Sequence, residues 1–293
     1  MRIEAFIGVV LFSGLVEAAP RPPNASEARI SPELRVLRDL PVSLHRAQAG
    51  PRIRGIAVDR VKVHVVLRPG LLARDFIQLN PSISGWAEVQ VVLGEELQLE
   101  IPWGKLGALS DYQSIHKIKL PNYATSKEYY TEGTVALFDS QPWSERGITG
   151  DGVTVAVIDV GFEGYKELIG SELPVGVGTD GLVGAWDEDN HGTAVAEIIH
   201  DVAPGSQIDL YSFETELEFR RLLDNFVRGE FEADVINASV GFDNVWTADG
   251  SSPYAQAVNA VADSGIFYVA AAGNEAENYR WGTLTDMDGN GFL

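Results

Sequence analysis

The sequence predicts an α/β protein in which a doubly wound parallel sheet follows a smaller α+β unit. Residues 153–158 are nearly all apolar and mostly β-branched, and glycines bound the run on both sides. Such a run is typical of a strand buried on both faces of a parallel sheet. From residue 153 onward, apolar runs alternate with segments of helical periodicity, which favours parallel strands connected by helices. Residues 58–121 instead follow the order βαββαβ.

That earlier stretch has the element order of a ferredoxin-like α+β unit. Leu97, Leu99 and Ile101 share one face of its third strand, so we expect Gln98 and Glu100 to point to water. We expect strands over 61–67, 86–93, 97–101 and 115–120, and helices over 71–79 and 105–112.

The second half repeats strand and helix at regular intervals. In the segment that follows residue 213, Phe219, Leu222 and Phe226 fall on one helical face. The expected elements are a helix beginning near residue 191, a strand over 208–213, a helix over 214–228, a strand over 235–240, a helix over 254–264 and a strand over 266–271.

Two side chains at the start of this half can carry chemistry. Asp159 ends the strand 153–158, and the carboxyl edge of such a sheet is where ligands bind. His191 follows 32 positions later at the start of a helix, which would present it beside the strand edge rather than in the core. Taken alone, Asp159 is better interpreted as a strand-end cap or a magnesium ligand. His191 taken alone is interpreted as a surface histidine at a helix end. The acidic residues 187–189 indicate a solvated loop or a metal site.

Four sequence blocks, taken together, narrow these alternatives. They are Val-Ala-Val-Ile-Asp-Val-Gly at 155–161, His-Gly-Thr-Ala-Val-Ala at 191–196, Ile-Asn-Ala-Ser-Val-Gly at 236–241 and Ala-Ala-Ala-Gly-Asn at 270–274. Their types and order resemble the subtilisin-like serine proteases, the subtilases, over roughly residues 132–285. The resemblance implies a secreted endopeptidase with a polypeptide substrate and a subtilisin-like doubly wound sheet.

The resemblance also implies roles for particular residues. Asp159 corresponds to the carboxylate that orients the base, and His191 to the general base. Asn274 corresponds to the side-chain donor of the oxyanion hole, with a turn residue as the alternative. Ser239, Val240 and Gly241 correspond to the strand that pairs with an extended substrate, with an ordinary core strand as the alternative.

The family's nucleophile lies in a Gly-Thr-Ser motif after the oxyanion asparagine. None of the 19 residues from 275 to 293 is a serine. We therefore expect residues 151–293 to be a subtilase catalytic domain truncated before its serine, and this chain to be inactive. The alternative is a non-catalytic peptide-binding or inhibitory protein derived from a protease.

The segments before the catalytic part suggest a precursor. Residues 1–19 have the pattern of a signal peptide, which predicts secretion, and 20–57 are expected to be a leader with a short helix over 31–39. Residues 58–121 have the topology of a subtilase propeptide, so the chain's own propeptide is an expected partner; a freestanding binding module is the alternative. Residues 122–150 form the junction, with 129–133 as the expected maturation segment.

Charge and composition exclude several other classes of protein. Residues 131–293 hold 29 acidic and 6 basic side chains, a net charge of −23, whereas residues 1–130 carry 13 and 16, a net charge of +3. This split argues against nucleic acid as a partner of the second half. The chain has no cysteine and no stretch long enough to span a membrane. We expect no required cofactor; Asp286, Asp288 and Asn290 resemble half of a calcium loop, and an acidic turn explains them equally well.

Overall fold

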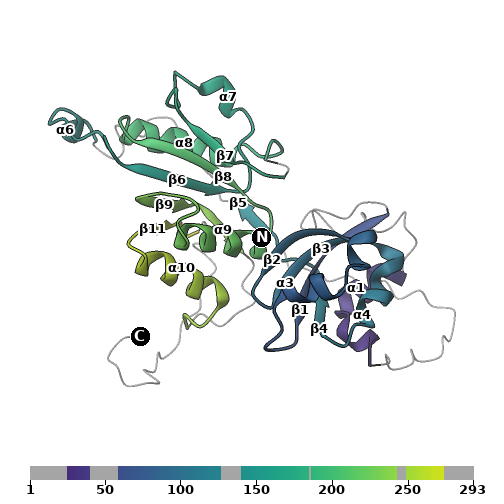
Figure 1. The fold of residues 1–293 in the computed structure, drawn as a ribbon. Coiled ribbons are helices and arrows are strands. Elements are labelled where there is room, and N and C mark those ends of the chain that lie inside the picture. Colours follow the sequence, from purple (N-terminus) through teal and green to yellow (C-terminus); the bar gives the residue numbers. More distant parts are fainter. Residues whose placement is uncertain (1–24, 40–58, 127–139, 185, 243–248, 274–293) are drawn as a thin grey trace, which may run out of the picture.

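The computed structural model shows an α+β unit and an α/β unit that are joined by a short strand (Figure 1). None of the described helices is long and apolar enough to cross a membrane. The signal peptide, the segment 129–133, Asn274 and the calcium-like residues 286–290 lie outside the described part of the chain. The structure describes residues 25–39, 59–126, 140–184, 186–242 and 249–273.

The first unit is an antiparallel four-stranded sheet with helices on one face. Its strand order is β2-β3-β1-β4, and β1 pairs with both β3 and β4. The order βαββαβ is observed as predicted, except that the second helix begins with a 3-10 turn. The elements are β1 (Arg60–Leu67), α3 (Ala73–Leu79), η2 (Ile83–Gly85), β2 (Glu88–Leu93), β3 (Glu96–Pro102), η3 (Trp103–Lys105), α4 (Leu106–Ser110) and β4 (Ile115–Lys119).

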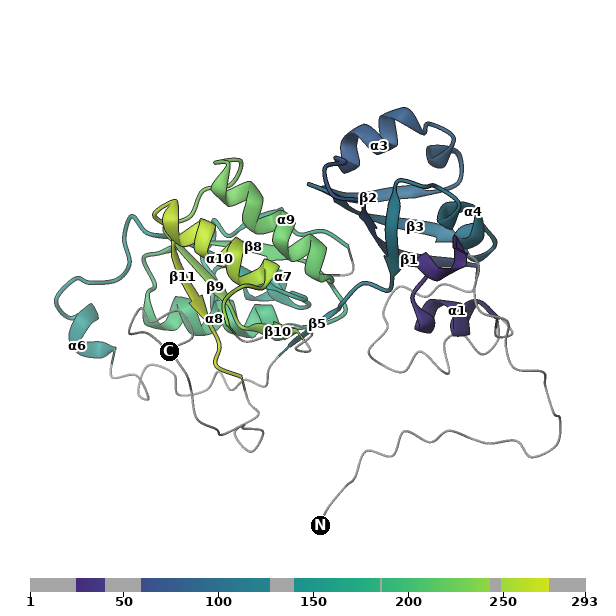
Figure 2. The same cartoon turned by 90° about the horizontal axis from the view of Figure 1, so that it is seen from below.

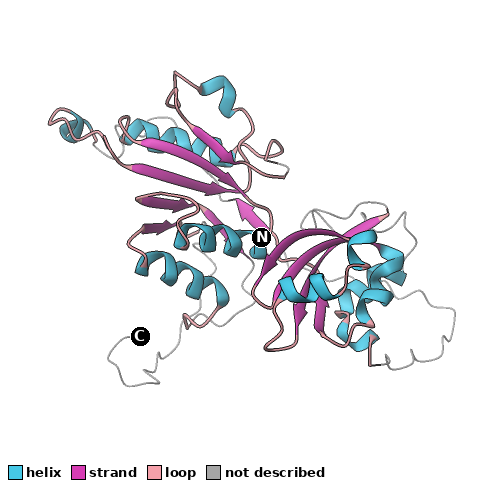
Figure 3. Cartoon of the chain, viewed as in Figure 1, coloured by secondary structure: helices cyan, strands magenta, loops and turns pink. Residues whose placement is uncertain are grey.

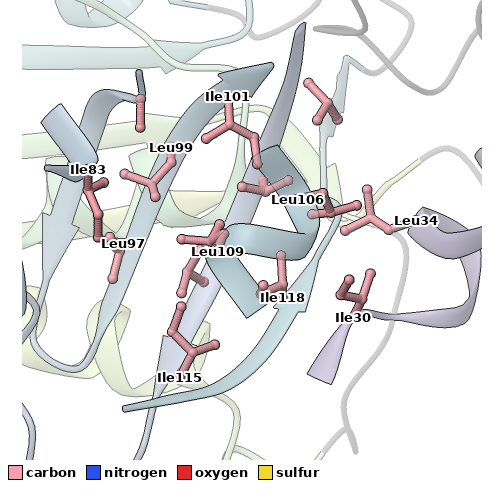
Figure 4. Packing of buried hydrophobic residues seen from close by; sticks show 14 of the residues in the cluster. Ile30, Leu34, Ile83, Leu97, Leu99, Ile101, Leu106, Leu109, Ile115 and Ile118 are labelled. Carbon is pink, nitrogen blue, oxygen red and sulfur yellow. The ribbon is translucent and has the colours of Figure 1, made fainter. Parts of the chain in front are cut away.

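The core of this unit lies between the sheet and its helices (Figure 4). Leu97, Leu99 and Ile101 are buried there, as their alternation predicts. The short elements η1 (Glu27–Arg29) and α1 (Pro32–Asp39) also belong to the unit, because Ile30 and Leu34 are buried in the same core. The sequence places these residues in the leader, whereas the structure packs them on the first sheet.

The second unit is a five-stranded parallel sheet in the order β11-β9-β6-β8-β7. The strand predicted to be buried on both faces, β6, lies at its centre. The elements are α6 (Gln141–Ser144), β6 (Thr154–Asp159), α7 (Tyr165–Leu168), β7 (Gly178–Gly181), α8 (His191–Val202), β8 (Gln207–Ser212), α9 (Glu216–Val227), β9 (Val235–Ala238), β10 (Val240–Phe242), α10 (Pro253–Asp263) and β11 (Phe267–Ala270).

Helices cover both faces of this sheet (Figure 3), as expected for a doubly wound arrangement. Alternate residues of β6 point to opposite faces. Ala156 and Ile158 pack in one core with α9 and α10, and Val157 packs in the other core with α8. Because β6 is flanked by β8 and β9, the strand order reverses at β6, which is where ligands bind in open α/β sheets.

A short strand from the junction ties the two units together (Figure 2). β5 (Ala124–Ser126) pairs antiparallel with β10, from Ala124 opposite Phe242 to Ser126 opposite Val240. The sequence predicts one strand over 235–240. The structure divides it at Ser239, because β9 pairs within the parallel sheet while β10 turns to pair with β5.

The polar face of the first sheet packs against the start of α9. Gln98, which we expected to face water, is fully buried. Its side-chain amide nitrogen donates to Glu218 Oε1 at 2.6 Å, and its amide oxygen accepts from Thr215 Oγ1 at 2.7 Å. Lys62 Nζ lies 2.7 Å from Glu214 Oε2. Burial opposes the charge on Lys62, but Glu218 and Glu214 raise its pKa.

A histidine also lies in this interface. The side chain of His64 is 1% exposed, and its Nε2 lies 2.6 Å from Glu96 Oε2. Glu96 also accepts from Arg220 Nη1 at 3.0 Å. Burial alone would raise the pKa of Glu96, but His64 and Arg220 bring it to about 2, so the carboxylate is ionised and the Nε2–H of His64 donates to it.

We expect the docking of the first unit on α9 to weaken in mild acid. Burial, assisted by Lys119, lowers the pKa of His64 from its ordinary 6.5, against the opposing influence of Glu96 and Glu216. When the first unit leaves α9, His64 becomes more exposed and its pKa rises toward the ordinary value, so the undocked state binds a proton at higher pH than the docked state. The stabilisation of the docked state by neutral His64 is fully present above pH 6.5. It is lost as the pH falls below 6.5, by at most about 1.4 kcal/mol per pH unit for one proton.

Urea unfolding of the parent and of His64→Gln between pH 5 and 8 measures this effect. Gln keeps a donor for Glu96 but does not titrate in this range, so its free energy of unfolding should fall less on acidification. Equal slopes for the two proteins would contradict the assignment.

Candidate active site

Asp159 and His191 meet at the carboxyl edge of the parallel sheet. Asp159 is the last residue of β6, and His191 is the first residue of α8. The distance from His191 Nδ1 to Asp159 Oδ2 is 2.8 Å. The other carboxylate oxygen, Oδ1, accepts from the backbone N–H of Val160 at 2.8 Å. The two residues that the sequence places 32 positions apart therefore form one hydrogen-bonded pair.

The pair is enclosed by protein. The side chain of Asp159 is 0% exposed and that of His191 is 3% exposed. His191 stands beside the strand edge, as the sequence predicts, but its side chain is buried there. Burial raises the pKa of Asp159, and the hydrogen bonds from His191 and Val160 oppose this shift.

This geometry fixes how the imidazole can act. When Asp159 is ionised it can only accept, so Nδ1 of His191 carries the proton and donates it. Nε2 then keeps its lone pair and can take a proton from a neighbouring group. The arrangement can therefore supply a general base whose tautomer is set by a buried carboxylate.

The loop after β6 holds the helix start in place. The backbone N–H of Gly192 donates to Gly161 O at 2.9 Å, and Thr193 Oγ1 donates to Glu163 O at 2.9 Å. Asp189 Oδ1 accepts from the backbone N–H of His191 at 2.9 Å. Within the described ranges no group of three or more His, Asp or Glu could hold a metal ion. Of the acidic run, Asp189 bonds to the helix start.

Gly192 leaves no space for a side chain. A Cβ there would lie 2.5 Å from the ring of Phe162, 2.6 Å from Gly161 O and 2.7 Å from Asp159 Cβ. The helix start can approach the Asp159 strand end this closely because residue 192 has no side chain.

An extended segment pairs with the second unit along both of its edges, and the space between its two partners is called the groove below. Residues 122–126 run between residues 214–216 on one side and β10 on the other. The backbone N–H of Ala124 donates to Glu214 O at 2.9 Å, and that of Glu216 donates to Asn122 O at 2.8 Å. Tyr123 forms an antiparallel bridge with Thr215. The segment is thus held by main-chain pairing on both edges.

The residues predicted to bind substrate fall on this groove in part. Val240 and Gly241 pair with Ser126 and Thr125. Ser239 lies at the break before β10, and its Oγ accepts from Asn237 Nδ2 at 3.2 Å. Sequence reasoning missed the opposite wall, residues 214–216, because their position across the segment from β10 depends on how α9 packs, and no motif marks it.

Comparisons with known proteins find similarity to serine proteases. Residues 150–287 match the model of the subtilase family, so this region resembles that family. The chain is 29% identical over 149 residues to the minor extracellular protease Epr of Bacillus subtilis (strain 168). That alignment covers 46% of this chain and 22% of Epr, so the chain matches about a fifth of that relative's length.

Two solved structures are also similar. Both are of the epidermin leader peptide processing serine protease EpiP from Staphylococcus aureus, one of them the S393A mutant, and each is 17% identical to this chain. The TM-scores are 0.46 and 0.48. The matches cover 74% of this chain and 60% and 61% of the EpiP chains.

Proposed function

We propose that this chain is the precursor form of a secreted serine endopeptidase. The observation that carries the proposal is the 2.8 Å bond between buried Asp159 and His191 at the reversal point of a parallel sheet. His191 acts as the general base, oriented by Asp159. Asn274 supplies the oxyanion donor, and residues 239–241 pair with the substrate.

The first unit acts in this proposal as the propeptide, the internal partner of the protease. Its junction places residues 122–126 in the groove where a substrate backbone would pair, as in β-strand addition. The polar contacts of Lys62 and Gln98 with α9 fix the first unit against the same part of the molecule. A peptide that is bound along the groove in this way would exclude other substrates.

The test is the labelling of the secreted product of the whole gene by a fluorophosphonate, which reacts with an activated serine. We expect His191→Ala to abolish labelling. Asp159→Asn should slow labelling by about 10⁴-fold, because the imidazole takes the wrong tautomer. Asp263→Asn, an exposed carboxylate on α10, is the matched control and should label like the parent.

A parent protein that is secreted and folded but never labelled would overturn the proposal. If an added extended peptide then displaced residues 122–126 from the groove, the non-catalytic peptide-binding alternative would replace it. The same alternative would follow if labelling were unchanged in His191→Ala.

A further inference from the structure

We propose that the groove accepts peptides with a side chain no larger than about that of alanine at the position of Ala124, and that Phe242 sets this limit. The inference rests on the proposed function, because it treats residues 122–126 as standing where a substrate lies. It adds the class of substrate: extended peptides with Ala, Gly or Ser at this position.

The backbone around Ala124 is fixed from both sides. Its N–H donates to Glu214 O, and it stands opposite Phe242 in the pairing of β5 with β10. A residue that is held in this way cannot retreat from the wall it faces. In strand addition the backbone bonds supply affinity and the recesses for alternate side chains supply specificity.

The apolar cluster that buries Ala124 is rich in aromatic rings. Ala124 is 5% exposed and belongs to the same apolar cluster as Phe213 and Phe219, and Phe242 and Tyr254 pack against that cluster. The rings contact each other with centroids 5.1 Å apart for Phe213–Phe219, 5.5 Å for Phe219–Phe242 and 4.9 Å for Phe242–Tyr254.

Phe242 holds these rings together. Its ring also lies 6.0 Å from that of Phe213, so it touches three of the other aromatic residues. Tyr254 in turn is anchored to the segment itself, because its hydroxyl accepts from Asn122 Nδ2 at 2.9 Å. A larger side chain at position 124 must therefore displace rings that are already packed on one another.

The test uses the full chain and needs no catalysis. Ala124 is replaced by Ser or by Leu, and hydrogen exchange of the backbone amides of residues 122–126 and 240–242 is measured. Ala124→Ser should keep the protection of the parent. Ala124→Leu should exchange about tenfold faster in this segment, since overpacking disfavours docking. Amides of β6 and β8 report on whether the second unit stays folded.

A second substitution decides whether Phe242 sets the limit. Phe242→Ala combined with Ala124→Leu should recover the protection that Ala124→Leu loses. The matched control is Phe231→Ala, a ring of the same core that packs on Tyr211 and Phe226 instead; it should not recover protection.

Parent-like protection in Ala124→Leu, or equal recovery by both ring deletions, would overturn the inference. These results are separable from failure of the proposed function. If the protein shows the exchange pattern but never reacts with fluorophosphonate, the size limit is supported and the proposed enzymatic function is contradicted. If the protein is labelled in a His191-dependent way but lacks the exchange pattern, the enzymatic function is supported and the size limit is contradicted.

Discussion

A polypeptide of these 293 residues should hydrolyse an unfolded protein no faster than its own His191→Ala variant. His191 and Asp159 can arrange a proton acceptor, but no serine follows Asn274 in this sequence. Loss of the nucleophile in subtilisin costs about 2 × 10⁶ in kcat, which equals about 8.6 kcal/mol at 1.36 kcal/mol per tenfold. Asp159 and His191 without a nucleophile cannot lower the activation barrier by that amount.

The measurement is release of acid-soluble peptides from the substrate over hours, with parent and variant purified side by side. Turnover that disappears in His191→Ala would contradict the prediction and would show that another hydroxyl serves as nucleophile. Ser251, Thr283 and Thr285 would then be the first residues to replace.

Replacement of Gly192 by alanine should destabilise the second unit by about 3 kcal/mol, near the upper end of what overpacking costs. Two of the three nearest atoms to the new Cβ, Gly161 O and Asp159 Cβ, belong to the backbone of the loop or lie close to it, so they cannot rotate away. The helix start would have to move, and His191 with it. Urea unfolding followed by circular dichroism measures the change in the free energy of unfolding.

Gly107→Ala is the matched control for this substitution. Gly107 lies in α4, and a Cβ there meets nothing within 4 Å. Alanine should therefore stabilise the first unit by about 0.5–1 kcal/mol, because it removes the flexibility of glycine in a helix. If Gly192→Ala behaved like Gly107→Ala, the close packing between α8 and the end of β6 would not be a constraint.

The sequence by itself determined most helices and strands and the pairing of Asp159 with His191. The apolar run that ends in Asp159 predicts the central strand, and its order relative to His191 predicts the pair that the structure joins at 2.8 Å. Alternation in β3 predicts that Leu97, Leu99 and Ile101 share a core. These features follow from short-range periodicity and from the rule that parallel strands end at one edge.

The tertiary structure decided which polar residues are buried and what lies in the groove. Gln98 alternates with core residues and is therefore predicted to face water, but the start of α9, more than a hundred positions away, covers it. The pairing of β5 with β10, which also joins distant parts of the chain, places Ala124 opposite Phe242. Periodicity describes which face a residue takes, whereas burial depends on which distant element packs on that face, and no local pattern encodes that.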